Sequence, residues 1–279
     1  MYLALALLSS LVLGSADFVG GAAARRARAA VVVIWSNAAG LLAALALVVL
    51  VLPGPVSPRD LGWGAAAGIS GSFGAVLLYR ALACGVMSMV APAAAAAAAA
   101  APVTVGIVMG DRISGPAAVG MVAALGSVVL LTHTSSPGPG RRPVARSMSY
   151  AVLAGVSFGF FLVLLAQTST TSTLWPLVAA RCASLGVLVG LARARRHTIQ
   201  LDGPSARLAA LAGMLDMASN VLFLIAVRGG ELAMVGVLAS LSPLGTVGLA
   251  RLVLRERLRA VQGLGAALAV GSVVLLALA

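Results

Sequence analysis

The sequence predicts an all-α integral membrane protein with ten transmembrane helices, arranged as two inverted five-helix repeats. Three observations lead to this prediction. Only 9% of the 279 residues are charged and 61% are hydrophobic, a composition with too little polar surface for a soluble domain, so that a lipid bilayer is the expected solvent. The chain contains ten apolar runs of about 20 residues, each long enough to cross the hydrocarbon core as a helix. Finally, its two halves share a sequence pattern.

The shared pattern emerges when the chain is displaced by 145 positions. Gly126–Leu131 then coincides with Gly271–Leu276, and both segments read GSVVLL. In the same register Asp111-Arg112 falls on Glu256-Arg257. Further matches in this register pair Gly14 with Gly159, Gly68 with Gly213, Ala81 with Ala226, Met89-Val90 with Met234-Val235, Gly120 with Gly265 and Ala124 with Ala269. So many matches in one register indicate a tandem duplication of a unit of about 140 residues.

The apolar runs divide evenly between the two units. We expect a first five-helix repeat over residues 1–133, a linker over 134–147 and a second five-helix repeat over 148–279. Glycine and proline mark the breaks between the runs. The expected spans are residues 2–23, 30–52, 62–82, 86–109, 115–132, 148–167, 173–191, 207–227, 231–250 and 260–279.

The arginines predict the orientation of these spans in the membrane. Every basic residue is an arginine, and 15 of the 19 lie in the odd-numbered connections, against three in the even-numbered ones. Cytoplasmic connections carry the excess of positive charge, so the odd-numbered connections should be cytoplasmic. Both termini are then expected on the non-cytoplasmic side of a multi-pass protein in the cell membrane.

The number of spans in each unit also constrains the orientation of the second unit in the membrane. Five is odd, so the second repeat must enter the membrane in the opposite sense to the first. Inverted repeats related by a pseudo-two-fold axis in the membrane plane are typical of secondary transporters, whose substrate sites lie near the midplane between the repeats.

Two ionisable residues inside the expected spans predict where such a site lies. Arg181 and Asp216 have similar expected depths, so an ion pair between them is feasible, and buried charges of this kind usually face the bundle interior. Ser219, Asn220 and Phe223 share one helix face with Asp216 at intervals of three, four and seven residues. We predict that these five residues bind substrate. The alternative is a structural ion pair that holds the two spans together.

Other positions receive predictions of a different kind. Asp17 and Arg80 both lie toward the cytoplasmic side and are predicted to pair as a gate or as a structural contact. Ser36 and Asn37 are polar residues without an assigned role. Ala93–Ala101, between two prolines, could line either a cavity or a close helix contact. Small residues four positions apart predict close helix packing: Ser10 and Gly14, Gly155 and Gly159, Gly120 and Ala124, and Gly265 and Ala269.

Several of these segments resemble the EamA-type transporters of the drug/metabolite transporter superfamily. Leu254-Arg255-Glu256-Arg257-Leu258 before a glycine-rich last span, and its weaker copy from Gly110 to Ile113, are similar to the family pattern. Tyr79-Arg80-Ala81-Leu82, followed by Gly85 and Met89-Val90-Ala91-Pro92, is similar to its junction of the third and fourth spans. The family proline upstream of the acidic-basic pair matches Pro243, whereas Pro102 in the first half is displaced by about one turn. The resemblance implies movement of amino acids, metabolites or drugs, commonly outward.

The sequence therefore predicts a secondary transporter that exports small organic solutes by alternating access. Its alternative is a non-transporting receptor or scaffold on the same fold. An enzyme is not expected, since the only histidines, His133 and His197, lie at loop ends and no nucleophile–base constellation accompanies them. No P-loop motif is present, and no cofactor, metal or nucleic acid is expected. The expected partners are a small-molecule substrate and the lipid bilayer, with proton coupling and the choice between monomer and homodimer left open.

Overall fold

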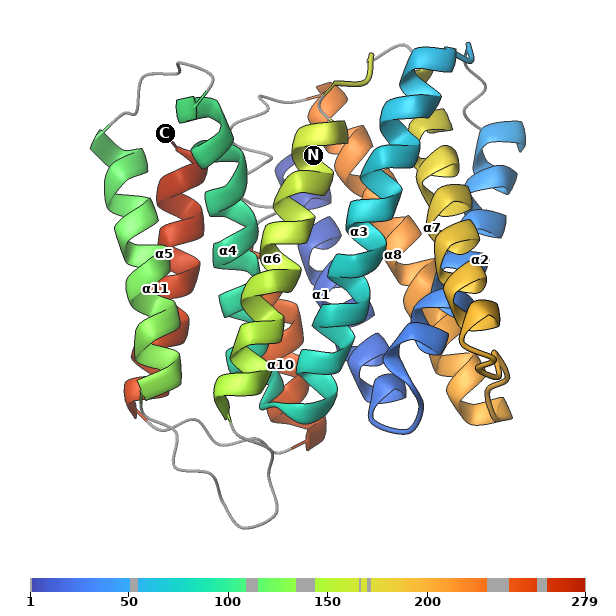
Figure 1. Ribbon diagram of the computed structural model, residues 1–279. Helices are drawn as coiled ribbons and strands as arrows, with labels where there is room; N and C mark the ends of the chain where they lie inside the picture. Colours follow the sequence, from blue (N-terminus) through green and yellow to red (C-terminus); the bar gives the residue numbers. More distant parts are fainter. Residues whose placement is uncertain are drawn as a thin grey trace.

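The computed structural model describes residues 2–50, 55–108, 115–133, 144–165, 167–169, 172–229, 241–254 and 260–278 (Figure 1). Throughout these residues the regular structure is helical, as predicted, and no strand occurs. The helices are α1 (Tyr2–Ala24), α2 (Ala29–Leu50), α3 (Pro58–Cys84), α4 (Met87–Val108), α5 (Gly115–His133), α6 (Val144–Leu165), α7 (Trp175–Ala194), α8 (Gly203–Gly229), α10 (Ser242–Leu254) and α11 (Ala260–Ala277).

Six helices are long and apolar enough to cross a membrane, judged over the described part of the chain: α1, α2, α3, α6, α7 and α8. Shorter apolar stretches occur in α4, α5 and α11. The predicted span over residues 231–250 lies largely outside the described residues, as does the acidic-basic pair at 256–257. Leucines and valines on the outer faces are well exposed, for example Leu42 and Val49 of α2, as expected for helices whose outer surface meets lipid.

Three helices start about four residues earlier in the structure than predicted, and for α3 a capping group accounts for the difference. The Ser57 hydroxyl accepts a hydrogen bond from the Asp60 N–H (3.5 Å), and Pro58 occupies a first-turn position where its missing N–H costs nothing. α3 therefore begins at residue 58 rather than 62, and α8 at 203 rather than 207. α6 begins at Val144, inside the segment predicted to be a linker.

The helix boundaries repeat with the same displacement of 145 positions as the sequence. Moving α3 by 145 gives residues 203–229, which are the bounds of α8. The first turns also match: the Leu61 N–H donates to the Ser57 carbonyl (2.9 Å), and the Ala206 N–H donates to the Asp202 carbonyl (2.9 Å). Equivalent sequence positions thus form equivalent helices.

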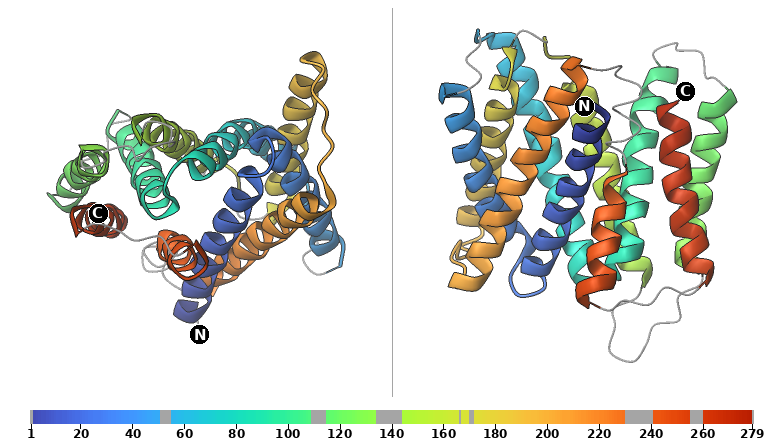
Figure 2. Two further views of the ribbon diagram at one scale, coloured as in Figure 1. Left: turned by 90° about the horizontal axis from the view of Figure 1, so that it is seen from below. Right: turned by 180° about the vertical axis from the view of Figure 1, so that it is seen from behind.

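Helices far apart in the sequence lie side by side in the bundle (Figures 1 and 2). α1 packs against α8 and α10, α2 against α8, α3 against α6 and α7, and α4 against α6. α5 and α11 form a pair at one edge of the bundle, beside α4. Both marked ends of the chain lie at the upper end of the bundle in Figure 1, whereas the connections from α1 to α2 and from α7 to α8 lie at the lower end.

Small residues permit the closest of these contacts, as predicted for Gly14 and Gly155. A Cβ atom at Gly14 would lie 2.3 Å from the Ser242 carbonyl oxygen, and one at Gly155 would lie 2.3 Å from the Ala94 carbonyl oxygen. The second contact also decides the role of part of the alanine run, because Ala94 belongs to it. Over this part of the run, α4 uses its small side chains for a close contact with α6.

We expect Gly68→Ala to destabilise the bundle, because a Cβ atom there would lie 2.0 Å from the Ala180 carbonyl oxygen of α7. A backbone atom cannot move aside without shifting the helix, so the free energy of unfolding should fall by about 1–3 kcal/mol or more. Gly186→Ala is the control, since a Cβ atom at Gly186 meets nothing within 4 Å and alanine favours a helix by about 1 kcal/mol. Thermal unfolding in detergent measures both. An equal midpoint for the two variants would contradict the close approach of α3 and α7.

Candidate functional site

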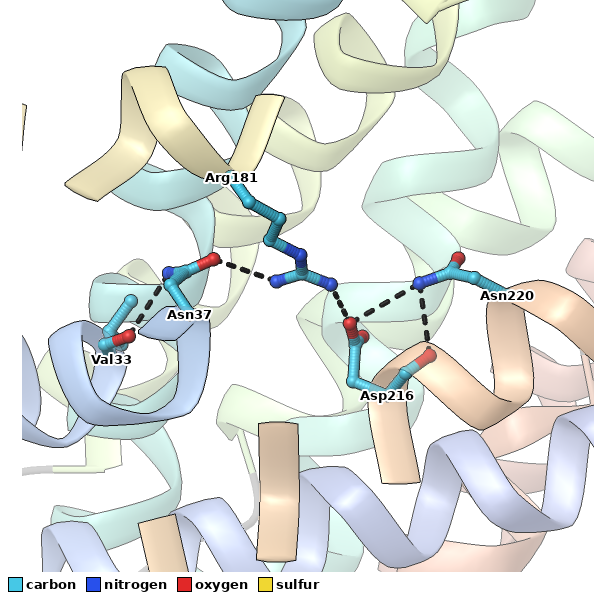
Figure 3. A network of polar contacts seen from close by, with 5 residues as sticks. All are labelled: Val33, Asn37, Arg181, Asp216 and Asn220. Atoms are coloured by element: carbon cyan, nitrogen blue, oxygen red, sulfur yellow. Dashed lines mark hydrogen bonds and ion pairs between the residues drawn. The ribbon is translucent and has the colours of Figure 1, made fainter. Parts of the chain in front are cut away.

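The predicted ion pair between Arg181 and Asp216 is present, and it joins α7 to α8 (Figure 3). Arg181 lies in α7, six residues after Trp175, and its guanidinium extends between α2 and α8. Its Nη2 contacts Oδ2 of Asp216, and its Nη1 donates to Oδ1 of Asn37 (2.7 Å). One cationic side chain of the second half of the chain therefore binds a polar side chain of the first half.

Asp216 is the middle residue of the 27-residue helix α8. Asn220, one turn later, donates from Nδ2 to the Asp216 carbonyl oxygen (3.0 Å) and to its carboxylate Oδ2 (3.2 Å). The carboxylate thus accepts hydrogen bonds from Arg181 and Asn220 together. Asn220 therefore orients the Asp216 carboxylate from the same face of α8, as expected for two residues one turn apart.

Asn37 of α2 completes the cluster, although no role was assigned to it from the sequence pattern. Its Nδ2 donates to the Val33 carbonyl (3.0 Å), which leaves its Oδ1 directed at the guanidinium (Figure 3). One signal could have identified this neighbourhood. Ser36 and Arg181 are 145 positions apart, so the duplication predicted from the sequence makes α2 the expected counterpart of α7.

The ion pair is only partly buried, since the Arg181 and Asp216 side chains remain 18% and 28% exposed. A guanidinium does not lose its proton in a protein, so its charge must be balanced wherever it lies in the membrane. Asp216 balances that charge and the two amides orient the pair. The cluster, Arg181, Asp216, Asn37 and Asn220, therefore presents fixed charges of both signs that another charged group could still reach.

Two predicted substrate residues point elsewhere. Ser219 is buried against α1, where its hydroxyl donates to the Ser9 carbonyl (3.0 Å) and lies 3.1 Å from the Ser9 hydroxyl. Phe223 packs with Ala6 and Ala226 in a small apolar cluster. Both side chains hold α8 against α1 in this conformation. The structure therefore does not bring them together with Arg181.

The predicted gate pair is not formed in this conformation. Arg80 is exposed, and no ion pair joins it to Asp17, although the structure describes both residues. Asp17 is partly buried in α1. The Tyr79 ring packs directly on Gly20, where a Cβ atom would lie 2.1 Å from the ring. A gating role for Asp17 and Arg80 stays a prediction about another conformation.

The second half of the chain decides the family. Residues 145–278, which include Arg181, Asp216 and Asn220, match the family model described as the EamA-like transporter family. This half of the chain belongs to the EamA-like transporter family. The resemblance inferred from the sequence motifs is thereby confirmed for residues 145–278, and the family match and the apolar helices together support a multi-pass membrane protein.

Two further comparisons bear on the fold alone. Among curated proteins, none matches this sequence. A solved structure titled "Crystal structure of protein" is similar in fold, with a TM-score of 0.62 and 17% sequence identity. The similarity covers 97% of this chain and 94% of the other. The bundle is therefore similar to a solved fold over nearly its whole length.

Proposed function

We propose that this EamA-type protein is a secondary transporter that moves small organic solutes by alternating access, with its substrate site at the Arg181–Asp216 cluster. The observation that carries the proposal is the position of this ion pair. It lies at the middle of α8, is partly exposed, and is bound through Asn37 to the first half of the chain. A charged group at such a depth is functional by default.

Exchange of helix contacts supports the inverted-repeat part of the proposal. Displacement by 145 positions converts α2 into α7 and α3 into α8, and both α2–α8 and α3–α7 are packed pairs. Their closest points correspond to within one residue: Gly68 meets the Ala180 carbonyl, and its counterpart Gly213 meets the Ser36 carbonyl, each with a Cβ distance of 2.0 Å. A pseudo-two-fold axis would exchange these two contacts. We accordingly propose two units over residues 1–133 and 148–279, with α6 of the second unit beginning at Val144.

The cluster suggests how a solute would bind. In the absence of solute, the ion pair keeps the net charge of the site at zero. A solute that carries a carboxylate could bind Arg181 in place of Asp216, and one that carries an ammonium group could bind Asp216 in place of Arg181. Either replacement pairs each charge again, so that it adds little free-energy cost of burying charge. Asp17, partly buried in α1, offers a second carboxylate for proton coupling. Outward movement of the solute is part of the proposal and rests on the family resemblance alone.

Topology gives the proposal its first test. Reporter fusions after Arg28, Arg142 and Arg196 are expected to read cytoplasmic, and fusions after Arg59, Ser172 and Gly230 are expected to read external. Both marked termini lie at one end of the bundle and the connections after α1 and α7 at the other, which supports this expectation. If both sets of fusions reported the same side, or if the sides were reversed, the inverted arrangement in the membrane would be wrong.

Metabolite profiling tests the transport proposal in cells. Cells that express the wild-type chain should differ from cells that express Asp216→Asn in the external and internal levels of at least one small solute. The Ser219→Ala variant is the matched control, because it removes an α1–α8 contact on the same helix without touching the ion pair. Identical profiles for wild type and Asp216→Asn, at equal amounts of folded protein, would contradict the proposal.

A further inference from the structure

A second buried polar cluster lies at the end of the bundle where α3 begins, away from Arg181. Asp60, in the first turn of α3, is only 4% exposed. Its Oδ1 accepts from the Ser169 N–H (3.1 Å), and its Oδ2 accepts from the hydroxyls of Ser169 (2.7 Å) and Ser172 (2.5 Å). Hydrogen bonds to an ionised carboxylate are about twice as strong as neutral ones, so this is a firm contact.

The cluster joins the two halves of the chain. Asp60 belongs to the first half, whereas Ser169 and Ser172 lie in the connection between α6 and α7. Next to Ser172, Thr173 has a φ of 46°, a left-handed conformation that is unfavourable for a β-branched residue. The following residue, Leu174, is fully buried in an apolar cluster with Val178 and Met217. The serines and Leu174 thus hold a strained connection in place directly before α7.

The contact continues from Asp60 toward the ion pair along α3 and α7. One turn below Asp60, Gly64 meets the Pro176 carbonyl, and Gly68 then meets Ala180, with Cβ distances of 2.3 and 2.0 Å. Ala180 is the neighbour of Arg181 in the sequence. These close contacts leave no space for α7 to slide along α3. The position of the first turn of α7 therefore determines the position of Arg181.

The opposite end of the bundle lacks the equivalent contact. Displacement by 145 positions relates Asp60 to Ser205, Ser169 to Ala24 and Ser172 to Ala27. Ala24 and Ala27 take part in the main apolar core, and neither can donate a side-chain hydrogen bond. The repeat therefore places a carboxylate–serine contact at one end of the bundle and apolar packing at the other. The two ends therefore differ in the side chains at these three repeat positions.

We propose that Asp60, Ser169 and Ser172 form a latch that keeps α7 closed against α3 at this end, and that the latch must open before the Arg181–Asp216 cluster can be reached from this side. Asp60 is then a positioning residue, which acts on the site through α7. The role of the latch in transport rests on the proposed function. The latch itself is a statement about helix position and is testable without a substrate.

Spin labels can measure the position of α7 directly. One label is placed at Val56→Cys, an exposed position just before α3, and the other on the native Cys182, which is exposed and adjoins Arg181. Cys84→Ala removes the remaining cysteine. In this background one dominant distance is expected. In the double variant Ser169→Ala, Ser172→Ala, a second, longer distance should become visible. The ratio of its population to that of the shorter distance should be about tenfold higher than in the wild-type background, because hydrogen bonds to a charged group are lost.

Asp60→Asn is the second variant, since it keeps the shape of the side chain and removes its charge; it should shift the distances in the same direction. Ser184→Ala is the matched control, a buried α7 serine whose hydroxyl has no hydrogen-bond partner, and it should leave the distances unchanged. A purely structural role would lower the unfolding temperature without adding a distance in the folded, monodisperse protein.

The outcomes separate the latch from the transport proposal. If the longer distance appears in the serine and Asp60 variants, the latch is supported, even if none of the proteins moves solute and the transport proposal fails. If both variants keep the wild-type distance, the latch is wrong, whether or not the wild-type protein transports.

Discussion

Asp216→Asn is expected to yield a folded protein that no longer transports. Its amide has nearly the same shape as the carboxylate, can still accept a hydrogen bond from Arg181, and can still be held by Asn220. The charge that balances Arg181 is lost, so a solute or proton that exchanges with this carboxylate has no partner. Removing one member of this partly buried charge pair is expected to lower solute flux about a hundredfold.

Flux normalised to folded protein checks this prediction, with Ser219→Ala as the control. Ser219 lies one turn from Asp216 on the same helix but bonds only α1, so its loss should cost stability of the order of one hydrogen bond and little flux. Wild-type flux in Asp216→Asn would remove this carboxylate from the mechanism. A fall in flux that is equally large in Ser219→Ala would mean that helix packing, rather than charge, controls transport.

Arg181→Ala is expected to destabilise the protein more than the double variant Arg181→Ala, Asp216→Ala. The single change leaves Asp216 without a cation in the middle of α8, and breaking a fully buried pair costs about 3–5 kcal/mol. The partial exposure of the two side chains, 18% and 28%, should reduce that figure. The double variant leaves no charge unpaired, so its stability should recover, while its flux should remain lost because both binding charges are absent.

Thermal unfolding and flux, measured on the same preparations, distinguish a functional from a structural ion pair. Recovery of stability without recovery of flux supports a substrate or coupling site. Recovery of both in the double variant would assign Arg181 and Asp216 to the scaffold and would redirect the search to Asn220. Failure of stability to recover would mean that the pair contributes packing as well as charge.

The helical class and the long helices could be predicted from the sequence, because hydropathy and the 145-residue displacement do not depend on which helices pack together. Hydropathy defines the long helices, and the 145-residue displacement carries the bounds of α3 onto those of α8. The pairing of Arg181 with Asp216 was also predictable, because two opposite charges at similar depth in neighbouring spans have few other partners. Capping accounts for the earlier start of α3, and the Ser57-Pro58 pattern in the sequence carried that information.

The site was harder to predict, since a helix face does not reveal which neighbour it meets. Asp216, Ser219 and Asn220 share one face of α8, but α1 and α2 both pack on that helix, so Ser219 meets α1 while Asp216 meets the cluster. Asn37 and Asp60 were missed for another reason. Their partners lie 144 and 109 positions away in the sequence, and spacing along one chain segment carries no sign of such contacts.

Solute flux in proteoliposomes tests the central claim most directly. Liposomes that contain the wild-type protein, Asp216→Asn or no protein are loaded with one mixture of amino acids, small organic acids and organic cations, and the release of each solute is followed by mass spectrometry. The account predicts that wild-type liposomes release at least one solute faster than both other preparations, by about a hundredfold over Asp216→Asn. Equal release of every solute from all three preparations, with the wild-type protein folded in the bilayer, would contradict it.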